Sequence, residues 1–453
     1  MTLKEQIKKL ETGELTSVDL LFQALKKHEA CLSKNAIATI SPLAYKMALE
    51  RDEERRKGIV RSPLHGIPIV IKDNILYKDF TPTTANAFAF HDLVPPFNAS
   101  IVDRLIEKGV VILGKANLSE FAYFMSYDNM PSGYGSMYGQ VKHPFDESID
   151  PLGSSTGSAV AVKLGIVPLS VGSETNGSLM APAYRTQIVS IKPSFGYVSK
   201  HGIIPISPTQ DTAGPMALSV YDAALLLDIL AFEDEKDQTT QALKRPKSFL
   251  EYIDDPVKEG KVGFIFIKEH TYTKEDLIVI DETKSVLSRM GLETIDIEIE
   301  YPKTKNDSTM LYEFKASMNA FITSLNGATK RSSLKDIIEF NEANKERCLR
   351  YGQSILTAAE STSGDLNDPV YLAYRKTLLE EFSLFETLIE TKGLIALTAP
   401  LWMGFAPIYG NPSINIPAGI IEGVIKSMVF VGKKFEDSKL IQLCHQFEMH
   451  KHL

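Results

Sequence analysis

Short apolar runs alternate with amphipathic segments along most of the chain. In the first half, continuous apolar runs at 67–71 and 110–113 flank residues 100–108, in which apolar positions recur at helical spacing. Runs of this length predict buried strands, and the segment between them predicts a helix. The order strand, helix, strand indicates an α/β fold in which helices pack against a sheet.

The same two patterns continue toward the end of the chain. Further apolar or alternating runs predict strands, at 188–191, 262–267, 294–299, 394–397 and 427–431, and residues 409–417 predict a turn followed by a strand. Helical spacing predicts helices over most of 1–60 and 300–390, and at 220–232, 275–290 and 437–450. Residues 122–152 predict an ordered loop, and the charged residues 233–256 predict a surface connection. Because no internal repeat or low-complexity segment divides the chain, we expect one domain spanning residues 1–453.

Composition and charge exclude several classes of protein. The chain has 453 residues, 44% hydrophobic and 23% charged, which fits a globular protein with a sizeable core. A net charge of −8, with no segment enriched in Lys and Arg, argues against a nucleic-acid partner. No apolar run reaches the length of a membrane span, so we expect no membrane partner. Three widely spaced cysteines (Cys31, Cys348 and Cys444) and a charged start predict a cytoplasmic protein without a disulfide framework.

Two turns rich in small hydroxyl residues interrupt the apolar pattern. They cover 153–158, Gly-Ser-Ser-Thr-Gly-Ser, and 172–178, Gly-Ser-Glu-Thr-Asn-Gly-Ser, with an apolar stretch between them. Small residues let the backbone come close to other backbone or to a ligand, and turns present hydroxyl groups. A short helix and a short strand between Ser154 and Ser178 would bring the two turns back to one place. On these residues alone, a plain Gly/Ser turn without chemistry is an equally good interpretation.

A serine hydroxyl becomes a good nucleophile only when a base removes its proton. The best candidate base is Lys72, which ends the apolar run 67–71. Burial at the end of a strand favours the neutral amine, which accepts a proton. Pairing with the adjacent Asp73 would have the opposite effect, but successive strand residues point to opposite faces. Asp73 and Asn74 are better explained as turn formers at the end of the strand.

These motifs resemble the signature of the amidase signature family, serine hydrolases of carboxamides with a Ser–cisSer–Lys triad. The likeness covers about residues 66–230 and, more faintly, the rest of the chain. Other pieces match in order: Thr-Thr-Ala at 83–85, Gly-Lys-Ala-Asn-Leu-Ser-Glu-Phe at 114–121, Ile-Lys-Pro at 191–193 and Asp-Thr-Ala-Gly-Pro-Met at 211–216. So many ordered matches are more specific than one short motif. The resemblance implies an α/β fold with one mixed central sheet covered by helices on both faces, and a signature core at 61–232.

The resemblance also implies a role for each residue of the triad. Ser178 matches the nucleophile, and Lys72 matches the base. Ser154 matches the serine that relays the proton between them, and the family pattern places a cis peptide bond between Gly153 and Ser154. No metal ion or cofactor takes part in this chemistry.

Further residues of the site follow from the same resemblance. The backbone N–H groups of the second turn, those of Thr175, Asn176, Gly177 and Ser178, would form the oxyanion hole. Ser155 would position or bind the substrate. We expect the helical block at 300–390 to pack beside the two turns and to shape the substrate entrance.

Four positions depart from the general pattern of the family. Leu152 and Thr156 stand where glycines are usual. Asn176 replaces the first glycine before the nucleophile, and Met180 replaces an arginine after it. Such changes are ordinary in the peptide-amidase branch. In some relatives the arginine holds a substrate carboxylate, so its absence argues against an anionic group close to the scissile amide.

We therefore expect an amidase that cleaves a peptide amide or another neutral carboxamide through an acyl-enzyme on Ser178. Two alternatives stay open, the amidase-type subunit of a tRNA-dependent amidotransferase and a catalytically silent binding protein of the same fold. The absence of the arginine, at Met180, weakens the first alternative. A homodimer and an esterase side activity also stay open. Trp402, Phe405 and Tyr409 are candidates for the acyl pocket, and loop packing explains them equally well.

Overall fold

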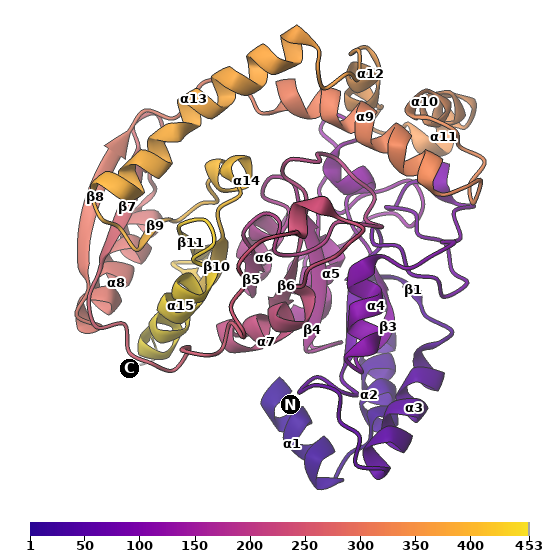
Figure 1. Ribbon diagram of the computed structural model, residues 1–453, viewed down its shortest axis with the longest axis horizontal. Helices are drawn as coiled ribbons and strands as arrows, with labels where there is room; N and C mark the ends of the chain where they lie inside the picture. The colour runs from indigo at the N-terminus through magenta and orange to yellow at the C-terminus, as the bar shows by residue number, and fades with distance from the viewer. Residues whose placement is uncertain (452–453) are drawn as a thin grey trace.

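The computed structural model describes residues 1–451, and the strands within this range form one 11-stranded sheet (Figure 1). The strands are β1 (Ile37–Ile40), β2 (Pro68–Lys72), β3 (Val111–Ala116), β4 (Leu169–Glu174), β5 (Val189–Lys192), β6 (Thr212–Ala217), β7 (Lys261–Ile267), β8 (Glu293–Ile299), β9 (Ala396–Ala399), β10 (Ser413–Ile421) and β11 (Val424–Val431). Across the sheet they stand in the order β1-β3-β2-β4-β6-β5-β10-β11-β9-β7-β8. The sheet is mixed, because β2 runs parallel to β3 and β4 whereas β6 runs antiparallel to β4 and β5.

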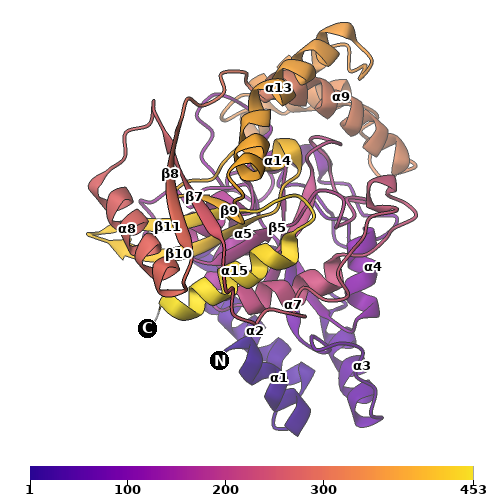
Figure 2. The same ribbon diagram turned by 60° about the vertical axis from the view of Figure 1, so that its left-hand side comes forward.

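Helices cover both faces of this sheet. They are α1 (Leu3–Thr12), α2 (Ser17–Ala30), α3 (Ala44–Arg56), α4 (Ser100–Glu107), α5 (Thr156–Lys163), α6 (Met180–Thr186), α7 (Val220–Leu230), α8 (Lys274–Arg289), α9 (Asp307–Ser324), α10 (Leu334–Ala343), α11 (Lys345–Cys348), α12 (Ser354–Glu360), α13 (Pro369–Thr391), α14 (Phe405–Tyr409) and α15 (Asp437–Lys451), with short 3₁₀ helices η1 (Leu32–Lys34), η2 (Phe88–Phe90), η3 (Glu120–Tyr123) and η4 (Gln238–Thr240). Every residue of β2 to β6 is buried. Since successive side chains of a strand point to opposite faces, both faces of this central part must be covered. Figure 2 shows α7 and α15, which contact each other, lying along the sheet.

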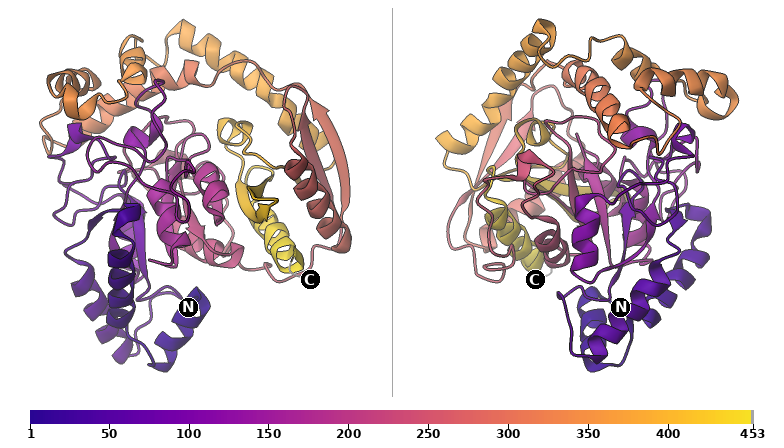
Figure 3. Two further views of the ribbon diagram at one scale, coloured as in Figure 1. Left: turned by 180° about the vertical axis from the view of Figure 1, so that it is seen from behind. Right: turned by 45° about the vertical axis from the view of Figure 1, so that its right-hand side comes forward.

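The helices α9 to α13 form a separate layer, which we call the helical block (307–391). Figures 1 and 3 show it as an arch that passes over the end of the sheet. At one end α13 packs against α14, and at the other end α10 and α11 pack against η2. The block therefore connects two parts of the molecule that are distant in sequence.

The predicted elements around the two turns are confirmed. The runs at 67–71 and 110–113 form β2 and β3, and the periodic segment between them forms α4. The stretch between the turns folds as α5 followed by β4, as expected. Residues 122–152 contain no helix or strand apart from the end of η3. The two turns therefore lie at the ends of elements that belong to the centre of the sheet.

Two strands lie where the sequence predicts none. β1 falls within 1–60, predicted as helical, because its four residues are too few to show the alternation of a strand. β6 contains Gly214 and Pro215, which usually mark a loop. A Cβ on Gly214 would lie 2.2 Å from the carbonyl oxygen of Ile191, so only glycine permits this close approach of neighbouring strands.

One sheet takes strands from both halves of the chain. The division into a single domain stays a prediction, which this continuity supports. In the part of the chain that the structure describes, no helix combines the length and the hydrophobicity needed to traverse a bilayer.

Candidate active site

Lys72 lies at the centre of a cluster of serine groups. It is the last residue of β2 and is fully buried. Its Nζ donates hydrogen bonds to Ser154 Oγ at 2.7 Å, to Ser173 Oγ at 2.9 Å and to Ser173 O at 3.2 Å. Asn74 donates to the same Ser173 Oγ at 3.0 Å. The structure therefore unites Lys72 with Ser154, as predicted, and adds Ser173, which sequence analysis missed.

The environment of Lys72 favours its neutral form. Burial lowers the pKa of Lys72 to about 7, and the negative charges of Glu174 and Asp211 oppose this shift. A substantial fraction of the amine is therefore unprotonated near neutral pH. Among the residues described, no ion pair joins Lys72 to Asp73, whose Oδ2 accepts from the backbone N–H and the hydroxyl of Thr84, at 3.1 and 2.7 Å.

The first turn places Ser154 beside this amine. The peptide bond between Gly153 and Ser154 is cis, as the resemblance implies. The neighbouring Ser155 is fully buried, and its hydroxyl donates to Ser173 O at 2.9 Å and accepts from Ser173 N at 3.1 Å. These two bonds attach the first turn to β4. A contact between Ser155 and the substrate stays a prediction.

The second turn, from the end of β4 to the start of α6, is closed by a carboxylate. Glu174 Oε2 accepts hydrogen bonds from the backbone N–H groups of Leu179 and Met180, at 2.7 and 3.1 Å. A carboxylate at this place satisfies donors at the N-terminus of α6. Gly177 has a φ of +81°, the left-handed region that favours glycine. The turn thus holds its backbone N–H groups in a fixed arrangement.

The two turns meet, as the sequence predicts. The backbone N–H of Ser155 donates to the carbonyl oxygen of Ser178 at 3.2 Å. Ser178 is 8% exposed, whereas Ser154 is fully buried. Among the hydrogen bonds of residues 1–451, none joins the Ser154 and Ser178 hydroxyls. Catalytic hydrogen bonds are often long without substrate and shorten in the complex.

A second carboxylate holds the middle of the second turn. The Thr175 hydroxyl donates to Asp211 Oδ1 at 2.5 Å, and Asp211 Oδ2 accepts from the backbone N–H groups of Ile206 and Ser207 at 2.8 and 2.9 Å. Gln210 Nε2 donates to Thr175 O at 3.1 Å. Burial raises the pKa of Asp211 to about 6. Sequence analysis matched the motif that begins at Asp211 without giving this residue a role.

The loop between β9 and α14 covers part of the second turn. A Cβ on Gly177 would lie 3.0 Å from Nε1 of Trp402, whose side chain is 41% exposed. Phe405, in contrast, is buried and stacks on Phe385 with ring centroids 4.0 Å apart. Tyr409 donates its hydroxyl to a carbonyl of α13. Of the three aromatic candidates for the acyl pocket, only Trp402 lies against the second turn, and the other two pack toward α13.

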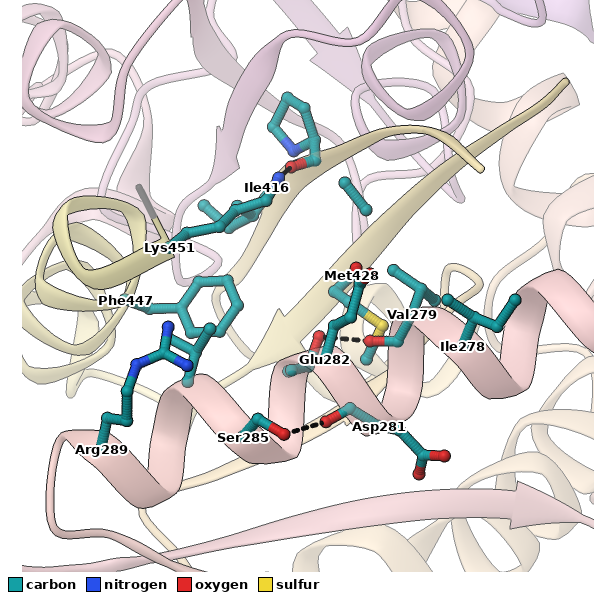
Figure 4. A pocket seen from close by; sticks show the side chains of 14 residues that line it. Ile278, Val279, Asp281, Glu282, Ser285, Arg289, Ile416, Met428, Phe447 and Lys451 are labelled. Atoms are coloured by element: carbon teal, nitrogen blue, oxygen red, sulfur yellow. Dashed lines mark hydrogen bonds between the residues drawn. The ribbon is translucent and has the colours of Figure 1, made fainter. Parts of the chain in front are cut away.

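A pocket of about 530 Å³ lies away from these residues, between α8, β10, β11 and α15 (Figure 4). Figure 4 shows Val279 and Met428 along its wall, with Phe447 and Lys451 toward one end. None of the predicted site residues lines it. A smaller cavity does border the site, and its lining includes Asn74, Ser173, Thr175 and Asp211. The buried lysine, rather than the size of a pocket, identifies the site.

A mixed sheet that positions a buried lysine next to two serine turns is the arrangement expected of the amidases, and comparison with known proteins gives the same result. A family model described as Amidase matches residues 19–380. The chain belongs to this family and is an amide hydrolase.

Individual relatives extend this finding. A probable amidase of Arabidopsis thaliana is 34% identical over 97% of this chain and 87% of its own length. A glutamyl-tRNA(Gln) amidotransferase component of Natranaerobius thermophilus is 30% identical over 99% of this chain and 95% of its own. The solved structure of native peptide amidase from Stenotrophomonas maltophilia superposes with a TM-score of 0.93 at 32% identity, covering 100% of this chain and 97% of that one. The predicted fold class and family are confirmed.

Proposed function

We propose that this chain hydrolyses peptide amides or other neutral carboxamides through an acyl-enzyme on Ser178, with Ser154 and Lys72 as the proton relay. The observation that carries the proposal is the 2.7 Å hydrogen-bond distance between the buried Lys72 Nζ and Ser154 Oγ, across which the neutral amine can accept the Ser154 proton. A general base must lie within hydrogen-bond reach of its proton donor and have a pKa near the working pH. Lys72 meets both conditions, since burial lowers its pKa to about 7.

The proposed reaction moves one proton along this relay in both directions. Ser178 Oγ attacks the carbonyl carbon while its proton passes to Ser154, whose own proton passes to Lys72. The resulting ammonium returns a proton through Ser154 to the nitrogen of the leaving amine, and the C–N bond breaks. Water then loses a proton to the same relay and attacks the acyl group, which releases the acid and restores Ser178.

The oxyanion formed in each attack needs preorganised donors. We assign this task to the backbone N–H groups of Thr175, Asn176, Gly177 and Ser178. Asp211 supports the assignment because it fixes the side chain of Thr175. Each such donor typically stabilises the transition state by a few kcal/mol.

Met180 supports a neutral substrate. Its side chain is 2% exposed at the start of α6, where a cationic residue would face an anionic substrate group. A methionine at this position supplies no charge to replace the water that a carboxylate near the scissile amide would lose. A peptide whose terminal carboxylate is amidated avoids this cost.

The test is release of ammonia from a panel of substrates by the purified chain. The panel contains peptide amides, simple aliphatic amides and glutamine, with chymostatin, the competitive inhibitor found in a solved complex of peptide amidase PAM, as a probe. We expect turnover of peptide amides, and a loss of about 1,000-fold or more in Ser178→Ala, Ser154→Ala and Lys72→Met, because the triad acts as a unit. Wild-type rates in Lys72→Met would overturn the relay.

The relatives named as components of a glutamyl-tRNA(Gln) amidotransferase favour one alternative function. An amidotransferase component would show little activity alone and would release ammonia from glutamine in preference to peptide amides. Activity of the single chain on peptide amides, without added protein or tRNA, rejects this alternative. Labelling of wild-type but not Ser178→Ala protein by a fluorophosphonate rejects a catalytically silent binding protein.

We further propose that the enzyme works in the cytoplasm, without metal or cofactor, as a monomer or homodimer. The cysteines within the described residues are all free, which supports a reducing compartment. Cell fractionation tests the location, activity in EDTA tests the metal, and light scattering tests the oligomeric state.

A further inference from the structure

A buried carboxylate of the helical block contacts the loop that precedes β6. Glu313 of α9 is fully buried. Its Oε2 accepts a hydrogen bond from the Ser207 hydroxyl, and its Oε1 accepts from the Thr209 hydroxyl at 3.0 Å. From within the block, the Tyr371 hydroxyl donates to Oε1 at 2.7 Å, and the Arg375 guanidinium lies 3.6 Å away. One carboxylate thus joins two helices to a loop more than 100 positions earlier in the chain.

The same loop reaches the second turn through Asp211. Ser207 is the shared residue, since its hydroxyl donates to Glu313 while its backbone N–H donates to Asp211 Oδ2 at 2.9 Å. Asp211 Oδ1 in turn accepts from the Thr175 hydroxyl. An unbroken series of hydrogen bonds therefore runs from the helical block to the turn that carries the proposed oxyanion hole.

Stability alone gives a poor account of Glu313. Removing a carboxylate from water is unfavourable, and apolar residues of similar size often replace buried ion pairs without loss of stability. What a carboxylate adds here is geometry, because its two oxygens bind two hydroxyls of one short loop at the same time. Ser207 and Thr209 are thereby held in the conformation in which Asp211 can meet Thr175.

We propose that Glu313 is a positioning residue for the oxyanion hole, acting through Ser207 and Asp211 on Thr175. The inference rests on the proposed function, since it assumes that the second turn stabilises the oxyanion. If the loop that precedes β6 is not held in place, the substrate still binds, but the oxyanion hole stabilises the transition state less well. The predicted effect falls on kcat, with KM nearly unchanged.

The first experiment compares two variants on the same helix. Glu313→Gln keeps the size of the side chain, but only one of its two terminal atoms can accept a hydrogen bond from a hydroxyl. We expect kcat on a peptide amide to fall about 10- to 100-fold, the usual cost of a misplaced catalytic group. Lys315→Met is the control, because Lys315 donates only within the block, to the carbonyls of Glu360 and Thr362 at 2.7 and 2.9 Å. We expect the control to keep kcat within about twofold.

Rates are expressed per reactive Ser178, counted from the end point of fluorophosphonate labelling. This count separates slow catalysis from loss of folded protein. A Glu313→Gln enzyme whose rate per labelled site equals the wild-type rate overturns the proposal. Wild-type protein that labels but hydrolyses no amide refutes the proposed function instead, so the two failures are distinct.

The second experiment asks whether Glu313 acts through Thr175. Thr175→Val removes the hydroxyl that Asp211 binds, and the double variant with Glu313→Gln completes a cycle. If both changes loosen the same turn, the double variant is about as slow as the slower single variant. Losses that multiply would overturn the proposed route. If Glu313→Gln does not fold, Ser207→Ala takes its place in the cycle and must give the same coupling.

Discussion

The pH dependence of catalysis gives the most direct test of Lys72. Only the neutral amine accepts a proton, so activity is present above the pKa of Lys72 and is lost as pH falls through it. Because burial lowers this pKa to about 7, half of the amine is neutral near that pH. About 1% is neutral two pH units lower, so kcat/KM should fall about 100-fold between its plateau and pH 5. If Lys72 kept the pKa of a lysine in water, the midpoint would lie above pH 10.

The assay is ammonia release from one peptide amide, with kcat/KM measured from pH 5 to 10. Lys192 needs a control, because it is also buried and burial lowers its pKa to about 8. Lys192→Met should leave the midpoint unchanged if Lys72 is the base. Asp211→Asn should shift the midpoint downward, since the charge of Asp211 raises the pKa of Lys72. This charge fades as Asp211 itself gains a proton near its pKa of about 6, which lowers the pKa of Lys72 there and makes the acid limb shallower.

Three results would refute the reasoning. A profile without slope between pH 5 and 8 would mean that no group with a pKa near 7 acts as the base. A midpoint above pH 9 would mean that Lys72 keeps its solution pKa. A midpoint that moves in Lys192→Met but not in Asp211→Asn would assign the titration to the other buried lysine.

Two further predictions follow from packing. Gly177→Ala should lower kcat about 10-fold or more, because its Cβ would lie 3.0 Å from Trp402 Nε1 at a φ of +81°. Gly139→Ala is its control, because Gly139 also has a positive φ, +79°, but its Cβ would meet nothing within 4 Å. This variant should lose only about 1 kcal/mol of unfolding free energy in a urea titration and keep a normal kcat. Equal losses of kcat in both variants would contradict a specific effect at the second turn. Phe385→Ala should destabilise the fold by about 3–5 kcal/mol, since it removes a buried ring stacked on Phe405. A change below about 1 kcal/mol in the same urea titration would show that the stack contributes little.

Local patterns were sufficient to predict the elements that carry the candidate site, whereas the roles of its residues came from the family resemblance. The apolar run before Lys72 defined a buried strand, and the small residues around Ser154 and Ser178 defined two turns. The order strand, helix, strand was visible because β2 and β3 begin as short apolar runs and α4 has apolar positions at helical spacing. Such patterns depend only on neighbouring residues, and the structure has β2 and β4 where the sequence predicts strands.

Contacts between distant segments escaped prediction for a physical reason. Nothing near Glu313 indicates that its carboxylate meets Ser207, which lies 106 positions earlier. Asp211 was matched as part of a motif, but its hydrogen bond to Thr175 depends on where β6 lies. This strand was not predicted, because Gly214 and Pro215 usually indicate a loop. Long-range pairing is set by the packing of whole elements, and periodicity along one segment carries no information about it.

The complete burial of Lys72 and Ser154 has a consequence for the fate of the transferred hydrogen. Neither group touches bulk solvent, so once a bound amide closes the approach to Ser178, the hydrogen taken from the nucleophile has no buffer molecule to receive it. It stays inside the protein until it is transferred to the nitrogen of the leaving amine. In the proposed chemistry the newly formed amine therefore carries away the nucleophile's own hydrogen, and isotope exchange with the medium has to wait for the product to leave.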